Sequence, residues 1–263
     1  MWHIRAFIPA LLLLASGLPE WGQTEPVTAF VGGELTAKEM SAKAPVIVIG
    51  FVGGFVRRDD SVHSGVQLAA RIHDAYPSGV YVKVFENRRR EQAHQEIVKI
   101  LDTDHDGTLS DKEKRDARIV IYGMSWGGSE TVELARELEA EKIPVLLTIQ
   151  VDSVAKRGQD DALIPPNVAE AVNFYQPDGL LHGQPEIHAV DPSRTRILGN
   201  YRYEYRSKSV RCENYPWYDR VFARQHTEIE CDPAVWNRVE SLIRSKLPLA
   251  GGGTAEGGVL AEC

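Results

Sequence analysis

The chain has 263 residues and a formal net charge of −7, with 43% hydrophobic and 25% charged residues. This is the composition of an ordinary folded globular protein, and a chain of this length can bury enough apolar surface to fold without a metal or a disulfide framework. The acidic balance and the lack of a long Lys/Arg block argue against nucleic acid as the main partner, because phosphate contacts need clustered cations.

The first residues have the pattern of a secretory signal peptide. A weakly basic start is followed by an apolar run over residues 6–15 and then by Ser16 and Gly17, small residues at which a peptidase can cut. The alternative is a membrane anchor, but an anchor needs about 20 apolar residues, and Pro19 ends the run too early. We therefore expect a signal peptide over residues 1–17, export to the periplasm or the exterior, and no stable membrane span.

Strand and helix patterns alternate after Pro45. Buried strands are expected over residues 46–49, 80–85, 118–122 and 145–151, and amphipathic helices over residues 66–76, 89–101, 127–140 and 232–246. Pro166 suits a first helical position, so a further helix carrying Val168, Ala171 and Val172 on one side is expected after it. The alternation predicts an α/β fold, with a mostly parallel sheet and helices on both faces.

The two ends of the chain lack this regular pattern. Residues 18–44 have mixed polarity without a sustained period, which predicts an N-terminal leader. Residues 247–263 contain five glycines, and such a composition predicts a disordered tail. A single domain is therefore expected over residues 45–246.

Residues 123–127 read Gly-Met-Ser-Trp-Gly, a G-x-S-x-G sequence between an expected strand and an expected helix. A sharp strand-to-helix turn forces strained backbone angles, which explains the flanking glycines, and it lifts the serine hydroxyl to the carboxyl edge of the sheet. The partial positive charge at a helix N-terminus favours an anion at that point. The context indicates that Ser125 is a nucleophile.

This strand, turn and helix resemble the nucleophile elbow of the α/β-hydrolase superfamily, and within it that of lipases and esterases. The resemblance extends over roughly residues 45–246, and it implies a serine nucleophile followed in the chain by a carboxylate and then by a histidine. Asp152, directly after the strand over residues 145–151, is the favoured acid, with Asp178 and Asp191 as rivals.

The histidine favoured by the resemblance is His226, because it precedes the last expected helix, where the histidine loop of the family usually lies. His182 and His188 are the alternatives that also follow the acid. In the mechanism that the resemblance implies, His226 takes the proton of Ser125 and Asp152 fixes the tautomer of His226. An acyl-enzyme then forms before water releases the acyl group.

The resemblance further implies an oxyanion hole, in which backbone N–H groups stabilise the developing negative charge. One donor would be the N–H of Trp126. The second is expected from the glycine-rich loop over residues 50–54, with the Phe51 N–H as the donor, although Ile49 stands where the family often has a histidine. The alternative is a glycine-rich turn that only lets the chain leave the sheet.

Residues 102–113, DTDHDGTLSDKE, match the twelve-residue EF-hand calcium loop at every diagnostic position. Calcium is a hard cation that takes about six to eight oxygen ligands. The expected ligands are the carboxylates of Asp102, Asp104 and Asp106, the carbonyl of Thr108, Ser110 through water, and both carboxylate oxygens of Glu113. The alternative is an Asp/Gly-rich turn in solvent.

The surroundings of this loop favour a structural role for calcium. An exit helix has room only for residues 111–117 before the next strand, and the sequence contains no second EF-hand to pair with the first. We therefore predict a fixed calcium clip, inserted before the nucleophile strand, and not a sensor.

The three cysteines are relevant to the expected export, because an oxidising compartment permits disulfides. A bridge between Cys212 and Cys231 would close a loop of about 20 residues, for which chain entropy gives roughly 3 kcal/mol. Cys263 is the last residue. Two alternatives stay open, the bridge and three free thiols, and the bridge is slightly favoured.

Aromatic side chains crowd the segment between the proposed acid and the proposed histidine. Tyr201, Tyr203 and Tyr205 alternate as in a strand, which favours packing on the sheet, whereas residues 215–218 are a candidate rim of the site. In the family this region often forms the pocket for the acyl or alcohol group.

Taken together, these patterns predict an exported, calcium-binding serine hydrolase, an esterase or lipase-like enzyme for a small-molecule or lipid ester. The competing hypothesis is a non-catalytic EF-hand calcium-binding protein on the same fold. A third hypothesis is carbohydrate binding through the aromatic residues of segment 201–222.

Overall fold

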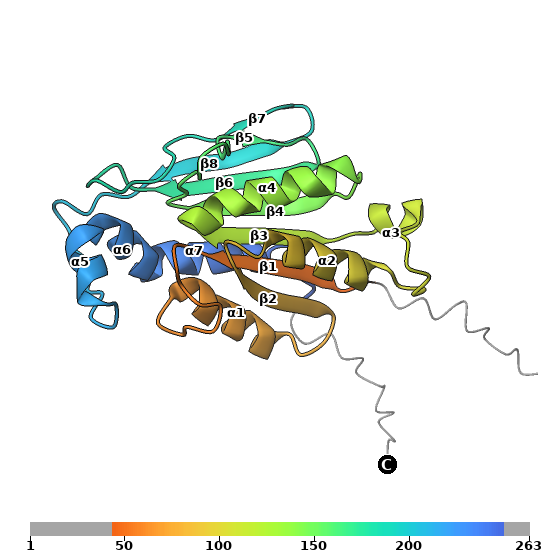
Figure 1. Cartoon of the computed structure of the whole chain (residues 1–263), viewed down its shortest axis with the longest axis horizontal. Coiled ribbons are helices and arrows are strands. Elements are labelled where there is room, and N and C mark those ends of the chain that lie inside the picture. The colour runs from red at the N-terminus through yellow and green to blue at the C-terminus, as the bar shows by residue number, and fades with distance from the viewer. Residues whose placement is uncertain (1–43, 250–263) are drawn as a thin grey trace, which may run out of the picture. The chain divides into compact units, whose positions relative to one another are not determined.

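A parallel sheet of six strands forms the centre of the computed structural model, which describes residues 44–249 (Figure 1). The strands are β1 (Val46–Val52), β2 (Val80–Glu86), β3 (Ile119–Met124), β4 (Val145–Val151), β6 (Val168–Tyr175) and β8 (Arg196–Arg202). Their order in the sheet is β2-β1-β3-β4-β6-β8, and every neighbouring pair is parallel. Two short strands, β5 (Leu163–Ile164) and β7 (His188–Ala189), pair separately. The predicted α/β class with a mostly parallel sheet is confirmed.

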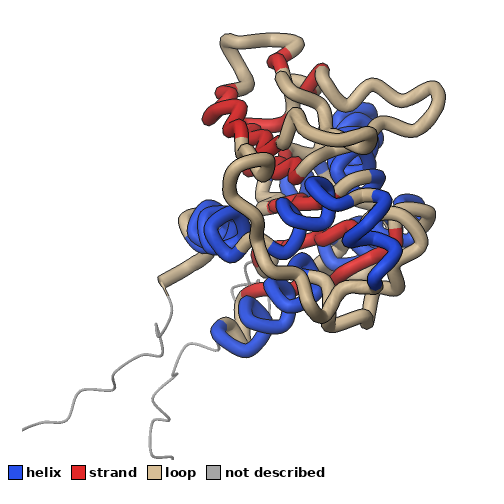
Figure 2. Tube along the Cα trace, turned by 90° about the vertical axis from the view of Figure 1, so that its left-hand side faces the viewer, coloured by secondary structure: helices blue, strands red, loops and turns tan. Residues whose placement is uncertain are grey.

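Helices cover both faces of this sheet (Figure 2). They are α1 (Ser64–Ala75), α2 (Arg90–Leu101), α3 (Asp111–Arg115), α4 (Trp126–Ala140), α5 (Trp217–Phe222), α6 (Arg224–Cys231) and α7 (Pro233–Arg244). Helices α1 and α7 share one apolar core with the sheet, and α2 and α4 share the other.

The sequence of β1 explains why two cores form. All seven of its residues are buried, and successive side chains of a strand point to opposite faces. Val46 and Val48 belong to the core with α1 and α7, whereas Ile47 and Ile49 belong to the core with α2 and α4. A continuous apolar run is therefore what this central position requires.

The prediction of a helix after Pro166 is wrong, because residues 168–175 form the strand β6. This strand pairs with β4 on one side and with β8 on the other. A short apolar segment cannot be assigned to helix or strand by periodicity alone. Here the backbone hydrogen bonds to β4 and β8 stabilise the strand.

The signal peptide expected over residues 1–17, the leader up to residue 43 and the tail from residue 250 lie outside the described residues. Within residues 44–249, no helix is long and apolar enough to cross a membrane.

The two edges of the sheet carry different parts of the chain. Because all six strands are parallel, the carboxyl ends of the strands meet at one edge, where the chain enters α4 and where α5 and α6 lie (Figure 1). The loop with the EF-hand pattern lies between α2 and the start of β3, so it belongs to the opposite, amino edge, where Figure 1 shows α3. The chain order reverses between β1 and β3, and such a switch point is where open α/β sheets bind ligands, outside the carboxyl ends.

Candidate active site

Ser125 occupies a strained turn at this switch point. Its backbone has φ 57° and ψ −125°, a combination that residues with a side chain rarely adopt and that persists only where the surroundings hold it. The Ser125 N–H donates to the Val151 carbonyl at 3.0 Å, and the Ser125 carbonyl accepts from the N–H of Val154 at 3.1 Å. The neighbouring strand β4 and the loop after it therefore fix the turn.

Two glycines make this turn possible, as the sequence predicts. A Cβ atom on Gly123 would collide with the carbonyl oxygen of Gly127, and a Cβ atom on Gly127 would collide with the carbonyl oxygen of Phe51. Helix α4 consequently packs directly on β3 and β1. Its N-terminus begins at Trp126, next to the serine hydroxyl.

Asp152 directly follows β4 and is fully buried, with a positive φ of 43°. Its Oδ1 accepts hydrogen bonds from the backbone N–H groups of Gln176, at 3.1 Å, and Gly183, at 2.8 Å. Its Oδ2 accepts from Gln176 Nε2 at 2.9 Å and lies 2.6 Å from Nδ1 of His226. Burying a carboxylate is costly unless it is paired and hydrogen-bonded, and four donors meet that requirement here.

The sequence predicts His226 in a loop before the last helix. The residue instead lies within α6, the helix before α7, and its side chain is buried. Because Nδ1 faces the Asp152 carboxylate, that nitrogen carries the proton, and Nε2 is left with its lone pair. Among residues 44–249, neither Nε2 nor the Ser125 hydroxyl has a hydrogen-bond partner, so these two groups do not bond to each other in this state. Catalytic hydrogen bonds are often long in the absence of substrate.

The rival residues make other contacts. Asp178 forms an ion pair with Arg206 at 2.7 Å, and Asp191 accepts hydrogen bonds from its own turn. His182 and His188 are exposed. Among the candidates the sequence offered, Asp152 and His226 are the acid and histidine that the structure brings together.

The loop that meets Ser125 begins later than expected. Phe51 lies inside β1, where it pairs with Phe85 of β2 and with Gly123 of β3, so its backbone belongs to the sheet. A Cβ atom on Gly53 would lie 2.7 Å from the Ser125 Cβ atom and 3.4 Å from its hydroxyl oxygen. The strand continues past Gly50, which moves the loop beside the serine to residues 53–56.

Two residues that position the acid, Gln176 and Gly183, were not predicted from the sequence. Gln176 binds both carboxylate oxygens of Asp152, and Gly183 approaches so closely that a Cβ atom there would lie 2.5 Å from the Asp152 backbone. Gln176 directly follows β6, so the signal was a polar residue at a strand end. The assignment of residues 168–175 to a helix concealed it.

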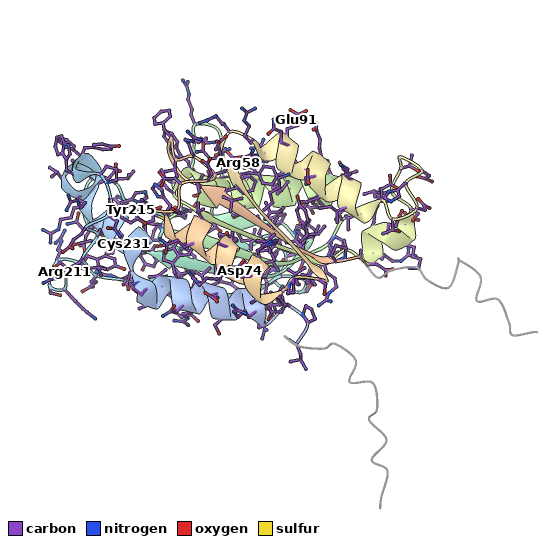
Figure 3. The ribbon with its side chains drawn as sticks, turned by 90° about the horizontal axis from the view of Figure 1, so that it is seen from below. Arg58, Asp74, Glu91, Arg211, Tyr215 and Cys231 are labelled. Atoms are coloured by element: carbon purple, nitrogen blue, oxygen red, sulfur yellow. A yellow bond between two sulfur atoms is a disulfide. The ribbon has the colours of Figure 1, made fainter. Side chains whose placement is uncertain are left out.

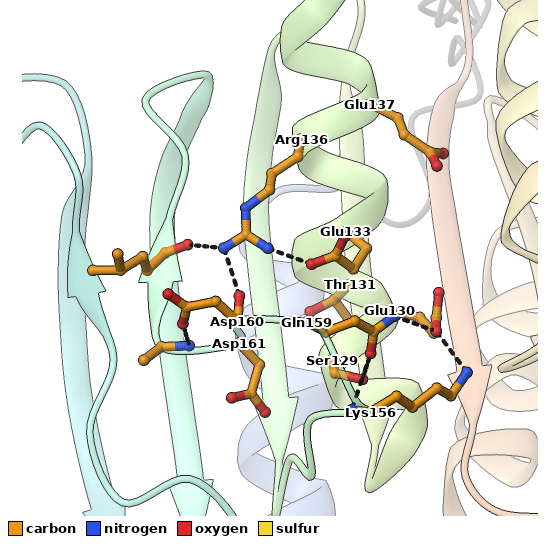
Figure 4. A network of polar contacts seen from close by, with 12 residues as sticks. Ser129, Glu130, Thr131, Glu133, Arg136, Glu137, Lys156, Gln159, Asp160 and Asp161 are labelled. Atoms are coloured by element: carbon orange, nitrogen blue, oxygen red, sulfur yellow. Dashed lines mark hydrogen bonds and ion pairs between the residues drawn. The ribbon is translucent and has the colours of Figure 1, made fainter.

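A buried polar network fastens the start of α4 (Figure 4). The buried Glu130 carboxylate accepts hydrogen bonds from Lys156 at 2.6 Å, from Arg90 at 2.5 Å and from Gln159 at 3.0 Å. Lys156 also donates to the backbone carbonyl of Asn87, at 2.9 Å. The elbow helix is thereby tied to the loop after β4, to the end of β2 and to α2.

A disulfide joins Cys212 to Cys231, with Cα atoms 5.9 Å apart. Of the two alternatives that the sequence left open, the bridge is therefore the one in the structure, and Cys263 lies outside the described residues. The bridge closes a loop that contains both α5 and α6, so the segment carrying His226 is covalently fastened at its two ends.

The loop with the EF-hand pattern gathers carboxylates at the amino edge of the sheet. Oxygen atoms of Asp102, Asp104 and Asp106 lie within 4.8 Å of one another. The carboxylate of Glu113 accepts hydrogen bonds from Ser110 and Thr103, and those bonds lower the pKa of Glu113 to about 2. A set of anionic and neutral oxygen donors fits a hard divalent cation.

Thr108 and Ser110, the two other expected ligands, lie in the same loop. Ser110 is the N-cap of α3 and forms a reciprocal capping box with Glu113. The Asp106 carboxylate accepts hydrogen bonds from the N–H and hydroxyl of Thr108, both at 2.8 Å, and Gly107 takes a positive φ of 85° at the turn. All six expected ligands therefore belong to one continuous turn, closed without help from distant segments.

Comparison with known proteins gives only distant similarities. No protein-family model matches the sequence, and no curated protein matches it. Among solved structures, the chain is similar to a cutinase-like protein from Cryptococcus sp., with 12% identity, a TM-score of 0.40 and coverage of 77% of this chain and 94% of that chain. It is also similar to dienelactone hydrolase from Anabaena variabilis ATCC 29413, with 13% identity, a TM-score of 0.39 and coverage of 78% and 86%. An acetylxylan esterase has 10% identity and a TM-score of 0.38, with coverage of 78% and 99%.

Proposed function

We propose that this chain is an exported serine hydrolase of carboxylic esters, with the α/β-hydrolase arrangement, in which Ser125, His226 and Asp152 act together. The observation that carries the proposal is the 2.6 Å contact between His226 Nδ1 and the buried Asp152 carboxylate, formed at the same sheet edge as the strained Ser125 turn. Ser125 directly follows β3, Asp152 directly follows β4, and His226 lies in α6, so three separate parts of the chain contribute. The ordered pair and a serine at the same edge of the sheet are the parts that such a triad needs.

In this reaction His226 acts as the general base. Nε2 takes the proton of the Ser125 hydroxyl while Oγ attacks the ester carbonyl carbon. The tetrahedral intermediate collapses as His226 returns that proton to the leaving alcohol, which gives an acyl-enzyme. Water then attacks the acyl carbon, His226 takes its proton, and the carboxylic acid leaves as Ser125 recovers its hydrogen. Asp152 holds the tautomer of His226 and stabilises the imidazolium.

The negative oxygen of the intermediate needs donors that are already in position. One is the N–H of Trp126 at the start of α4, as expected from the sequence. For the second we assign the backbone of the loop after β1, at Gly53 and Gly54, in place of Phe51, because Gly53 adjoins Ser125. Loss of one such donor typically costs about 2.7–4 kcal/mol of transition-state stabilisation.

Calcium has a structural part in this proposal. Asp102, Asp104, Asp106 and Glu113 would hold the ion with their carboxylates, assisted by the Thr108 carbonyl and by Ser110 through water. A calcium ion held there would neutralise carboxylates that otherwise repel one another and would stabilise the connection between α2 and β3. Since β3 has six residues and a strand rises about 3.3 Å per residue, the loop lies at the far end of β3 from Ser125, and an ion held there would be too distant to act on the ester.

Export is supported by two independent features. The N-terminal residues have the pattern of a signal peptide, and the Cys212–Cys231 bridge is of a kind that persists in oxidising compartments. We therefore propose that the protein works in the periplasm or outside the cell.

A fluorophosphonate probe tests the catalytic proposal without knowledge of the substrate. The calcium-loaded wild type should be labelled, and Ser125→Ala and His226→Ala should each abolish labelling. Ser129→Ala, one turn further along α4, is the matched control and should be labelled like the wild type. A folded wild type that takes up no label would favour the non-catalytic calcium-binding alternative, and labelling that persists in Ser125→Ala would place the nucleophile elsewhere.

A further inference from the structure

Each of the four large apolar side chains of helix α5 is at least half exposed. Trp217 is 64% exposed, Tyr218 51%, Val221 63% and Phe222 73%. The Trp217 ring contacts the rings of Tyr218 and Phe222, with centroids 6.1 Å and 6.3 Å apart, so these side chains pack on one another and not into the core. Single exposed apolar residues are ordinary, but four within one short helix make a patch of the kind that marks an interaction surface.

The segment that carries this patch, which we call the α5 patch, is rich in basic residues. The segment over residues 206–224 has five basic and two acidic residues, although the whole chain has a net charge of −7. The basic residues, all exposed, are Arg206, Lys208, Arg211, Arg220 and Arg224. Arg206, Arg211 and Arg224 form ion pairs with Asp178, Glu213 and Glu228. Within residues 44–249, Lys208 and Arg220 have no ion-pair partner, so these two carry the unpaired positive charge beside the patch. Figure 3 shows Arg211 at the same end of the molecule as Cys231.

The α5 patch is rigidly connected to the candidate active site. The Cys212–Cys231 disulfide encloses α5 and α6, and the Thr227 hydroxyl donates to the Asp219 carbonyl at 3.0 Å across the two helices. Leu180, which is 99% exposed, follows Gly179, whose position adjoins Gln225 of α6. The exposed apolar side chains are thus held at the sheet edge where Ser125 and His226 lie.

We propose that the α5 patch docks the protein on an anionic lipid bilayer. Trp217, Tyr218 and Phe222 would enter the interface, where aromatic side chains are favoured. Lys208 and Arg220 would contact the phosphates of the headgroups, because anionic lipids attract basic residues beside an apolar face. A second copy of this chain fits the patch less well, because it would bring two sets of like charges together. The proposal goes beyond the hydrolase assignment, since this surface binds lipid whether or not Ser125 is a nucleophile.

Quenching of tryptophan fluorescence by brominated lipids tests the insertion directly. The full chain is mixed with vesicles of brominated phosphatidylcholine and phosphatidylglycerol, and the wild type is compared with Trp217→Phe and with Trp236→Phe. Trp236 is buried in the core and is the matched control. We expect Trp217→Phe to lose part of the quenching and Trp236→Phe to keep all of it. The N-terminal segment is identical in all three proteins, so the difference between variants reports on α5 alone.

Charge reversal tests the choice of lipid. Lys208→Glu combined with Arg220→Glu should weaken binding to phosphatidylglycerol vesicles on the order of tenfold. Lys99→Glu combined with Arg194→Glu changes the net charge equally at exposed positions away from α5 and should bind like the wild type. The same measurements on Ser125→Ala should give the same pattern, which separates docking from hydrolysis.

Three outcomes would overturn the proposal. The first is equal quenching in the wild type and Trp217→Phe. The second is binding that does not distinguish phosphatidylglycerol from phosphatidylcholine vesicles. The third is a lipid-free dimer, measured by sedimentation, that Phe222→Ser dissociates, because the α5 patch would then be an interface between two copies of the chain.

Discussion

The two edges of the sheet carry polar sites that are built in opposite ways. At the amino edge, all the expected calcium ligands come from one continuous turn over residues 102–113, and their hydrogen bonds are local. At the carboxyl edge, Ser125, Asp152 and His226 come from distant parts of the chain, and two of the three have strained backbones. A local site depends on its own sequence, whereas the composite site depends on the whole sheet being assembled.

The largest effect is expected at the carboxyl edge. Ser125→Ala should lower kcat for ester hydrolysis on the order of 10⁴-fold to 10⁶-fold. The melting temperature should change little, because the hydroxyl has no hydrogen-bond partner among residues 44–249. Steady-state rates and a thermal melt check the two parts, and Ser129→Ala is the control. A large fall in stability without loss of rate would show that the elbow is a structural feature only.

A smaller effect on rate is expected from Gln176, which acts on the reaction only through Asp152. Removing hydrogen bonds to a buried carboxylate typically costs about 1.5–3 kcal/mol each, so Gln176→Ala should lower kcat roughly tenfold to a hundredfold. Because Gln176 orients a group and does not touch the ester, KM should stay near that of the wild type. Gln184→Ala, in the same stretch of chain, is a comparison variant. A change in KM alone would contradict a positioning role.

Ser125 and Gln176 differ in how far their roles could be predicted from the sequence. The Ser125 turn is marked by a short local pattern, and Asp152 follows a strand whose apolar run is unambiguous, so both were predicted. Gln176 and Gly53 take their positions from where β6 and β1 end, and those ends are set by pairing with neighbouring strands. The calcium ligands could be proposed residue by residue because the pattern is contiguous, and both the ligand set and calcium binding stay predictions.

At the amino edge, the prediction concerns stability and not rate. Calcium at about a hundredfold excess over its dissociation constant should stabilise the fold by about 2.7 kcal/mol, which corresponds to a melting temperature higher by roughly 5–10 °C. Chelation should reverse this shift, and Asp104→Asn should weaken it, while kcat at 25 °C stays unchanged. Asp74→Asn, exposed on α1, is the control. If calcium binds but the melting temperature is the same with and without calcium, a structural role is excluded.

The smallest effect is expected from a buried pair that ties α6 to the loop before α1. His63 Nδ1 lies 2.5 Å from the Glu230 carboxylate, and Nε2 lies 3.8 Å from Asp60. Burial opposes the charged form of His63, but the hydrogen bond and the charge of Glu230 outweigh it and raise the pKa of His63. The charges of Asp60 and Asp219 act in the same direction.

The sign of this linkage fixes the pH window. A raised pKa in the folded state means that the pair stabilises fully below the unfolded value of about 6.5 and ceases to do so as the pH rises through the folded value. His63→Gln should therefore lower the free energy of unfolding most at acidic pH, with the deficit shrinking as the pH rises. Denaturant titrations at several pH values measure it, with the exposed His73→Gln as the control. A deficit that is constant with pH would show that His63 acts through packing alone.

Because of its position between α2 and β3, the predicted calcium loop over residues 102–113 could be replaced as a unit without disturbing either element. Connections from a helix to the next strand usually need about 2–6 residues, whereas here residues 102–118 separate α2 from β3. Both flanking elements pack in the same apolar core through Ile97, Leu101 and Ile119, and Glu130 and Arg90 tie α2 to the elbow helix independently of the loop. Residues 102–113 could therefore be exchanged for a short glycine turn, which should remove the predicted calcium dependence of the melting temperature and leave the predicted hydrolysis at 25 °C unchanged. The same connection could carry other metal-binding turns grafted onto the fold.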